Sequence, residues 1–224
     1  MKPFEIITIF LAAGSLLGLF FYRRKGPFLY LLFLAAIAAI VQYLSDGLRW
    51  QMLATIYILP AMFITYKYKI VNRFTGTILG AWFLISGFIP WAVPVFTMPA
   101  PEGDFSIGSE TFHWVDSSRL EWFTDENDND VREIMVQAWY PSENSNSIGT
   151  NSYMDFMNLR SKTLASAGKI PAFLPSHLDM ISTNTRNDVA CSNKLEKYPV
   201  FIFSHGITGS RHLHQILFEH LASK

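Results

Sequence analysis

Four long apolar runs fill the first 98 residues and limit the fold more than any other feature. They are Phe4–Tyr22, Phe28–Leu44, Met52–Tyr66 and Phe74–Phe96. A helix that crosses a membrane needs about 20 mostly apolar residues, within a range of about 17–25. The first and fourth runs meet this length, the second lies at its lower edge, and the third is short unless Trp50 and Gln51 are included and contains Pro60. We therefore predict that residues 1–98 are an α-helical membrane anchor with four transmembrane helices.

The basic residues between these runs predict how the anchor is oriented. Arg23, Arg24 and Lys25 follow the first run, and Lys67, Lys69 and Arg73 follow the third. Loops rich in Lys and Arg stay in the cytoplasm. With four spans, both basic loops are cytoplasmic only if the N-terminus and everything after Phe96 lie outside. A cleaved signal peptide is not indicated for the first run, because its cations would precede the apolar stretch.

The interiors of the four runs lack ionisable side chains, which favours a passive anchor. Transporters and channels place such groups within their spans. Pro60, Pro90 and Pro94 could kink helices around a transport site, so a small transporter with an appended domain is an alternative.

The charge of the chain changes sign after the anchor. Residues 1–98 contain eight Lys/Arg and two Asp/Glu, whereas residues 99–224 contain ten and sixteen. The overall net charge of zero argues against a nucleic-acid partner, which would need a basic surface. Cys191 is the single cysteine, so a disulfide scaffold is excluded. Residues 99–224 are therefore predicted to be an acidic, extracytoplasmic domain.

Hydrophobic patterns in this domain predict alternating strands and helices. Strands are expected at Glu110–Asp116, Arg132–Tyr140 and Pro199–Ser204, and helices at Tyr153–Ala167, around Phe173–Ile181 and at Arg211–Ser223. The apolar run Pro199–Ser204 is typical of a strand buried in a parallel sheet. A glycine-containing turn and an amphipathic helix follow it, which makes two-thirds of a βαβ unit. No returning strand precedes Lys224, so we expect an α/β domain that is incomplete at its C-terminus.

Three ordered blocks of this domain resemble a known family. The first is Pro99–Pro141, with DSSR at Asp116–Arg119 and REIMVQAWYP at Arg132–Pro141; the second is His177–Thr185; the third is Tyr198–Ser223, with the sequence YPVFIFSHGITGSRHLHQILFEHLAS. Together they resemble the platelet-activating-factor acetylhydrolases, and in particular their bacterial membrane-anchored relatives. The resemblance implies the N-terminal part of an α/β-hydrolase domain and the hydrolysis of carboxylic esters by a serine nucleophile.

The resemblance also assigns a role to the His205–Gly206 dipeptide. In α/β-hydrolases, a loop after the third strand supplies one backbone N–H of the oxyanion hole. At the matching positions, Gly206 would form the oxyanion loop and the N–H of Ile207 would be the donor. The alternative is that His205–Ser210 is only a strand-to-helix turn, in which Gly and Ser cap the helix.

The catalytic triad itself is not found in these 224 residues. No serine has glycine at both −2 and +2, as a G-x-S-x-G nucleophile elbow requires. The family places its nucleophile, acid and base after the H-G dipeptide, so this chain is expected to be a fragment that is inactive alone.

No metal or cofactor is predicted. His212 and His214 are two residues apart on the expected helix and cannot chelate together. The acidic residues Asp125, Glu126, Asp128 and Asp130 lack the spacing of a calcium loop. The leading prediction is thus a membrane-anchored hydrolase of lipid or other esters, and the main alternative is a non-catalytic membrane protein with an extracytoplasmic interaction domain.

Overall fold

The computed structural model describes residues 1–21, 25–122, 127, 129–143, 150–206 and 209–224. The chain forms two compact units. The first comprises Met1–Phe96 together with Asn158–His177, and the second comprises Thr97–Met157 together with Leu178–Lys224. Each unit is described separately below.

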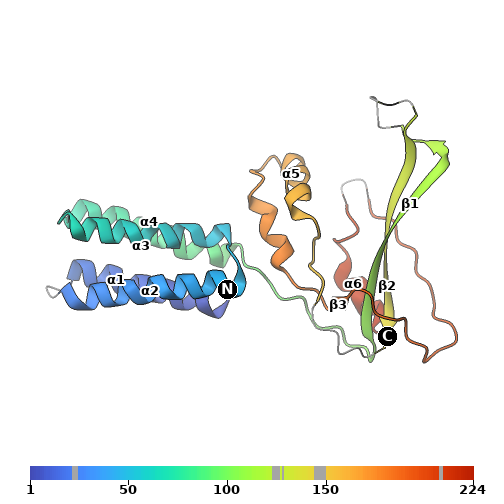
Figure 1. Cartoon of the computed structure of the whole chain (residues 1–224), viewed down its shortest axis with the longest axis horizontal. Coiled ribbons are helices and arrows are strands. Elements are labelled where there is room, and N and C mark those ends of the chain that lie inside the picture. Colours follow the sequence, from blue (N-terminus) through green and yellow to red (C-terminus); the bar gives the residue numbers. More distant parts are fainter. Residues whose placement is uncertain (22–24, 123–126, 128, 144–149, 207–208) are drawn as a thin grey trace. The chain divides into compact units, whose positions relative to one another are not determined.

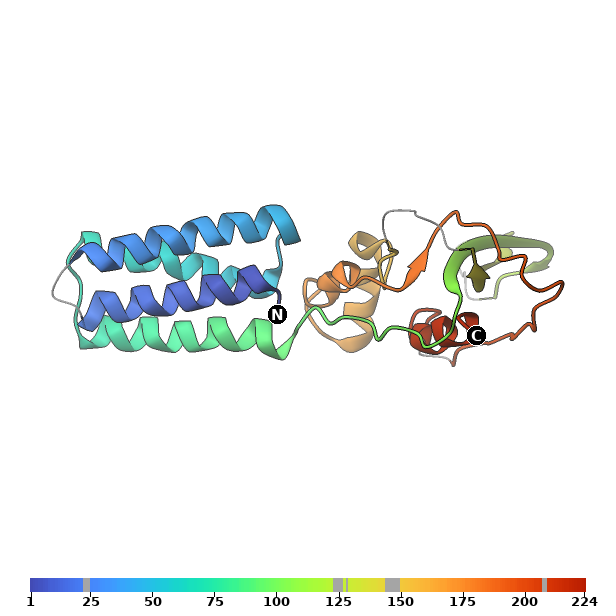
Figure 2. The same ribbon diagram turned by 90° about the horizontal axis from the view of Figure 1, so that it is seen from below.

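All four apolar runs are helical, as predicted. The helices are α1 (Pro3–Phe21), α2 (Lys25–Asp46), α3 (Trp50–Lys67) and α4 (Arg73–Ala92). Figures 1 and 2 show the four helices side by side. Helix α4 ends four residues before the apolar run does, because Pro94 has no N–H to continue the helical hydrogen bonds.

Small residues allow the helices of this bundle to approach closely. Ala12, Ala35 and Ala39 are buried among larger apolar side chains of the core such as Phe28 and Ile58. At Gly18 of α1, a Cβ would lie 3.4 Å from the backbone of Phe28 in α2. Interfaces between membrane helices are rich in such residues, because small side chains let the backbones pack against each other.

The outward face of the bundle is also apolar. Large exposed side chains include Phe10, Phe21, Phe33, Ile40, Phe74, Leu84 and Phe88. A helix that is apolar on all sides is typical of a membrane span. Within the described residues, three helical segments are long and apolar enough to cross a membrane: Pro3–Phe21, Gly26–Asp46 and Arg73–Ala92.

The prediction of four transmembrane helices is therefore wrong in number. Helix α3 does not qualify as a span, because its 18 residues include Gln51, Thr55 and Lys67. The polar side chains of Gln51 and Thr55 are buried within the bundle, where Thr55 Oγ1 donates to the carbonyl of Ser86 at 3.2 Å. The extracytoplasmic orientation was argued from four spans and stays a prediction.

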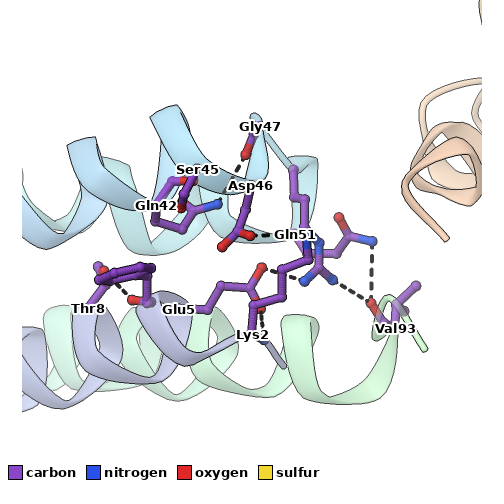
Figure 3. A network of polar contacts seen from close by, with 11 residues as sticks. Lys2, Glu5, Thr8, Gln42, Ser45, Asp46, Gly47, Gln51 and Val93 are labelled. Carbon is purple, nitrogen blue, oxygen red and sulfur yellow. Dashed lines mark hydrogen bonds and ion pairs between the residues drawn. The ribbon is translucent and has the colours of Figure 1, made fainter. Parts of the chain in front are cut away.

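A second correction concerns ionisable groups in the bundle. Glu5, the second residue of the first apolar run, is fully buried and forms an ion pair with the fully buried Arg49. Arg49 Nη2 and Gln51 Nε2 both donate to the carbonyl of Val93, at 3.1 and 3.3 Å. Figure 3 shows this network at one end of the bundle, where Lys2 also pairs with Asp46 at 3.1 Å. The bundle thus buries an ion pair that the sequence pattern did not indicate.

The second unit is built on a long antiparallel hairpin. Strand β1 (Ser106–Leu120) pairs with β2 (Val131–Ser142) from Ser106↔Ser142 to Asp116↔Arg132, and the register shifts between Asp116 and Leu120. The strands predicted at Glu110–Asp116 and Arg132–Tyr140 are confirmed and are longer than expected. A short strand, β3 (Thr185–Arg186), pairs parallel to β1, so the sheet order is β2-β1-β3.

The predicted helices are present with shifted bounds. Helix α5 spans Met157–Gly168 and begins four residues later than expected, because Phe156 has a φ of 51°, which lies outside the right-handed helical region. The short helix expected around Phe173–Ile181 is a 3₁₀ helix, η1, at Leu174–Met180. Helix α6 spans only Gln215–Ala222, since residues 211–214 form turns.

The prediction of a buried strand at Pro199–Ser204 is wrong in this structure. The segment has no strand assignment, and Val200, Phe201 and Ile202 are 84%, 71% and 96% exposed. A strand needs a neighbour to satisfy its backbone groups, and no ladder of the described residues includes this segment.

Candidate active site

The turn at His205–Ser210, called the H-G turn below, is closed by a main-chain hydrogen bond. The N–H of Gly209 donates to the carbonyl of Gly206 at 2.8 Å. The same carbonyl lies 2.9 Å from Nδ1 of His205. His205 therefore contributes to the order of the turn.

Of the two predicted oxyanion-hole residues, only Gly206 lies among the described residues. Ile207 lies outside the described residues, so its assignment as the N–H donor stays a prediction. Gly206 is exposed, and a Cβ added to it would meet no atom within 4 Å. Substrate could thus reach the backbone at Gly206, but packing gives no reason why this residue must be glycine.

Gly209 is the glycine of the turn that packing requires. A Cβ at this position would lie 2.9 Å from Cβ of His205 and 3.1 Å from the carbonyl oxygen of Gly206. The sequence analysis assigned no role to Gly209, although its place in the H-G-x-x-G spacing could have suggested one.

The residues that follow the turn bind both the sheet and the segment before α5. Arg211 Nε donates to Oε1 of Gln137 on β2 at 2.9 Å, and Arg211 Nη2 forms an ion pair with Asp155. His212 is buried, and its Nε2 lies 3.2 Å from the other oxygen of Asp155. We call Gln137, Asp155, Arg211 and His212 the Arg211 cluster. None of the four was singled out as functional in the sequence analysis, because their contacts span 56 and 74 residues along the chain.

Helix α6 presents its polar face to the rest of the unit. Glu219 is 1% exposed and accepts a hydrogen bond from Nδ2 of Asn184 at 2.7 Å. The hydroxyl of Ser223 accepts from the N–H of Gly103 at 3.1 Å. The apolar residues that were predicted to share one face are exposed: Leu213, Ile216, Leu217 and Leu221.

An open apolar groove lies along this exposed face of α6. Its volume is about 530 Å³, and its walls are residues 99–102 together with side chains such as Leu213, Ile216, Leu217 and His220. None of the described residues that line the groove is a serine. Trp139 and Phe203 pack on a different side chain of α6, Phe218, with ring centroids 4.6 and 5.3 Å apart.

The DSSR block has a structural role at the end of the hairpin. Asp116 accepts hydrogen bonds from the N–H of Ser118 at 3.0 Å and from Nε of Arg119 at 2.6 Å. Hydrogen bonding to the Ser118 hydroxyl, and then to Arg119, lowers the pKa of Asp116 to about 2. These contacts lie at the register shift between Asp116 and Leu120.

No metal centre is evident in the part of the chain that the structure describes. Within those residues, no three His, Cys, Asp or Glu side chains are grouped so that they could hold a metal ion. His212 pairs with Asp155, whereas the ring of His214 packs against Phe203 at 4.8 Å.

A comparison with known families identifies the second part of the chain. Residues 93–224 match the model of the family described as platelet-activating factor acetylhydrolase, isoform II. The chain belongs to this family. The match covers all three blocks that carried the resemblance, including the H-G turn and the Arg211 cluster. No curated protein matches the chain, and no solved structure does.

Membership in the acetylhydrolase family shows that the domain is of a hydrolase family. The region from Val93 onward is a hydrolase-family domain, and the helices before it are compatible with association with a membrane. The family's bacterial membrane-anchored type is not distinguished by this match.

Proposed function

We propose that this protein is a membrane-anchored carboxylic-ester hydrolase that acts on lipid esters. The family match over residues 93–224 carries the proposal. The apolar outer surface of the helical bundle supports the membrane anchor, because a surface of this kind is stable in lipid and not in water. By its name, the family hydrolyses the acetyl group of platelet-activating factor, and we take a phospholipid with a short acyl chain as the first substrate to test.

The proposed chemistry is acyl transfer through a serine. The serine hydroxyl attacks the ester carbonyl while a histidine takes its proton, the alcohol leaves with a proton, and water then hydrolyses the acyl-enzyme. Negative charge develops on the carbonyl oxygen in both steps. We assign the N–H of Ile207 to this oxyanion, with Gly206 leaving the backbone accessible. No serine of these 224 residues has the flanking glycines of the elbow, so none is assigned as the nucleophile.

We further propose that the hydrolase-family region lies on the extracytoplasmic side. The support is the distribution of cations on the two sides of α4: Lys67, Lys69 and Arg73 stand before or at its start, whereas Met98–Asp104, after its end, contains no cation. Cys191 gives a direct test, because it is the single cysteine and is exposed. A maleimide that cannot cross membranes should label Cys191 in intact spheroplasts. Labelling only after lysis would place the domain in the cytoplasm.

Hydrolysis is tested with the product of the complete open reading frame, in the membranes of the expression host. We expect release of p-nitrophenol from p-nitrophenyl acetate and of acetate from a 2-acetyl phospholipid. Ile207→Pro removes the assigned N–H and should lower kcat by about 10²–10³. Ile207→Val keeps this N–H and serves as the control. An inactive parent protein contradicts the proposed activity, and an active Ile207→Pro variant contradicts only the assignment of the donor.

One observation favours a second candidate, a non-catalytic interaction domain. Val200, Phe201 and Ile202 form an exposed apolar segment, and the apolar face of α6 is exposed as well. Exposed apolar surface of this kind marks interaction sites in folded proteins. A stable, monodisperse protein that lacks all esterase activity would support this candidate over the hydrolase.

A further inference from the structure

Arg211 joins the strand hairpin to the segment that follows the H-G turn. Its Nε donates to Gln137 of β2 at 2.9 Å, and Gln137 Nε2 in turn donates to the hydroxyl of Ser109 on β1 at 2.9 Å. A continuous series of hydrogen bonds therefore runs from β1 through β2 to Arg211. Because β1 and β2 are the most extensively paired elements of the unit, this series attaches Arg211 to a rigid part of the fold.

The carboxylate of Asp155 contacts two consecutive residues, Arg211 and His212. One carboxylate oxygen pairs with Arg211, and the other lies 3.2 Å from Nε2 of His212. The side chains of Arg211 and His212 are 13% and 3% exposed. The Asp155 side chain is 35% exposed, so the contact is shielded from water on the side of Arg211 and His212 only. The charge-assisted bond between a guanidinium group and a carboxylate nevertheless has a defined geometry. Two consecutive residues that bind one carboxylate have little freedom to rotate about their backbone.

The cluster lies directly beside the H-G turn. Only Ser210 separates Arg211 from Gly209, whose N–H closes the turn onto the carbonyl of Gly206. The carbonyl of Ser210 accepts from the N–H of Leu213 at 3.2 Å, which continues the ordered backbone toward α6. A displacement of Arg211 would therefore be passed to Gly209 and to the main-chain bond that holds Gly206.

We propose that Arg211 and Asp155 are positioning residues for ester hydrolysis: they hold Gly209 in place and, through its main-chain bond, Gly206, the two glycines that stand in sequence on either side of the assigned oxyanion donor. The inference rests on the proposed function. Oxyanion donors act at 2.7–3.1 Å from a charge that exists only in the transition state, so they must be placed in advance. A misplacement of about 1 Å can cost about 10²-fold in rate. Neither residue needs to touch the ester.

The substitution Arg211→Lys separates positioning from folding. Lysine keeps one positive charge near Asp155, but it cannot reproduce the two separate bonds of the guanidinium group to Gln137 and Asp155. Asp155→Asn similarly keeps the shape of the carboxylate and removes its charge. The matched control is Arg119→Lys, which alters another Arg–Asp pair of the unit; Arg119 Nε lies 2.6 Å from Asp116 and is remote from the turn in sequence.

Activity is measured on the complete gene product in membranes, together with thermal unfolding. We expect Arg211→Lys and Asp155→Asn to lower kcat by about ten- to a hundredfold. KM should stay within about twofold, because ground-state binding is unchanged. Arg119→Lys should leave both constants unchanged. A wild-type kcat in Arg211→Lys, or a fall in kcat explained by a matching loss of folded protein, would overturn the proposal.

Hydrogen exchange gives a measure that does not depend on activity. The peptide that contains residues 203–213 should exchange faster in Arg211→Lys than in the parent and in Arg119→Lys, because the turn opens locally more often. Unchanged exchange would overturn the anchoring of the turn. If the parent protein hydrolyses no ester, the proposed function fails and the positioning role in catalysis fails with it, whereas faster exchange would still show that Arg211 holds the turn.

Discussion

Two glycines of the H-G turn differ in what a side chain would meet there. At Gly209, an added Cβ would lie 2.9 Å from Cβ of His205, an atom fixed to the backbone that cannot move aside alone. Gly209→Ala should therefore destabilise the second unit by about 1–3 kcal/mol, as overpacking does elsewhere. The measurement is the unfolding midpoint of the purified protein in urea.

Gly206→Ala is the control within the same turn. A Cβ at Gly206 meets nothing within 4 Å, so we expect stability to change by less than about 0.5 kcal/mol. If Gly206 is open because substrate approaches its backbone, the same substitution should reduce hydrolysis while the protein stays folded. Equal destabilisation by the two substitutions would show that the turn does not have the described conformation.

At the scale of elements, Asp116 makes the end of the β1–β2 hairpin sensitive to acid. Its pKa is lowered from 3.8 to about 2 by the Ser118 hydroxyl and by Arg119. A carboxylate with a lowered pKa stabilises the fold where it is ionised in both the folded and unfolded states, above about pH 4. That stabilisation is lost as the pH falls toward about 2, because the proton then competes with the hydrogen bonds.

The pKa can be read directly by carbon-detected NMR of the Asp116 carboxyl group in the second unit. Asp116→Asn should remove the part of the acid sensitivity that falls between about pH 4 and pH 2. Arg119→Met should raise the pKa of Asp116 only in part, since the Ser118 contacts remain. A titration of Asp116 at its ordinary value in the parent protein would contradict the hydrogen bonds described here.

The sequence predicted those elements whose determinants are local. The alternation of Ile134, Val136 and Ala138 predicts β2, and the long apolar runs predict α1 to α4. The late start of α5 depends on the positive φ of Phe156, which no residue pattern indicates. Strand β3 has only two residues and pairs with β1 across about 80 residues of sequence, so its pattern is too short to detect.

The candidate site could be predicted only in part for the same reason. The H-G dipeptide is a local motif, and it directed attention to Gly206 and Ile207. Arg211 stands close to it in sequence, but its partners Gln137 and Asp155 are 74 and 56 residues away. The run Pro199–Ser204 shows the opposite error: it has the composition of a buried strand, yet burial depends on a partner that its own sequence cannot specify.

At the scale of the whole molecule, the two units should respond separately to substitutions. Glu5 and Arg49 belong to the first unit only, and both side chains are fully buried. Arg49 Nη2 also donates to the carbonyl of Val93, the first residue of the region that matches the family. The ion pair therefore stabilises the part of the bundle from which the hydrolase-family region begins.

Removing one partner of this pair should be far more harmful than removing both. Glu5→Ala leaves the Arg49 charge buried without its carboxylate, which typically costs about 3–5 kcal/mol. The double variant Glu5→Leu/Arg49→Met replaces the pair by apolar groups of similar size and should recover most of this loss. Lys2→Ala is the control, because the partly exposed pair of Lys2 with Asp46 should contribute about 0–1 kcal/mol.

Unfolding in detergent micelles, monitored by the proteolysis of each unit, tests the effect of the Glu5–Arg49 pair and the separate response of the two units. Glu5→Ala should lower the transition of the first unit and leave that of the second unchanged, whereas Gly209→Ala should do the reverse. Two transitions that move separately require that few stabilising contacts are shared between the units. A single transition shifted by both substitutions would mean that the two units unfold together, and the second unit would then depend on the helical bundle for its stability.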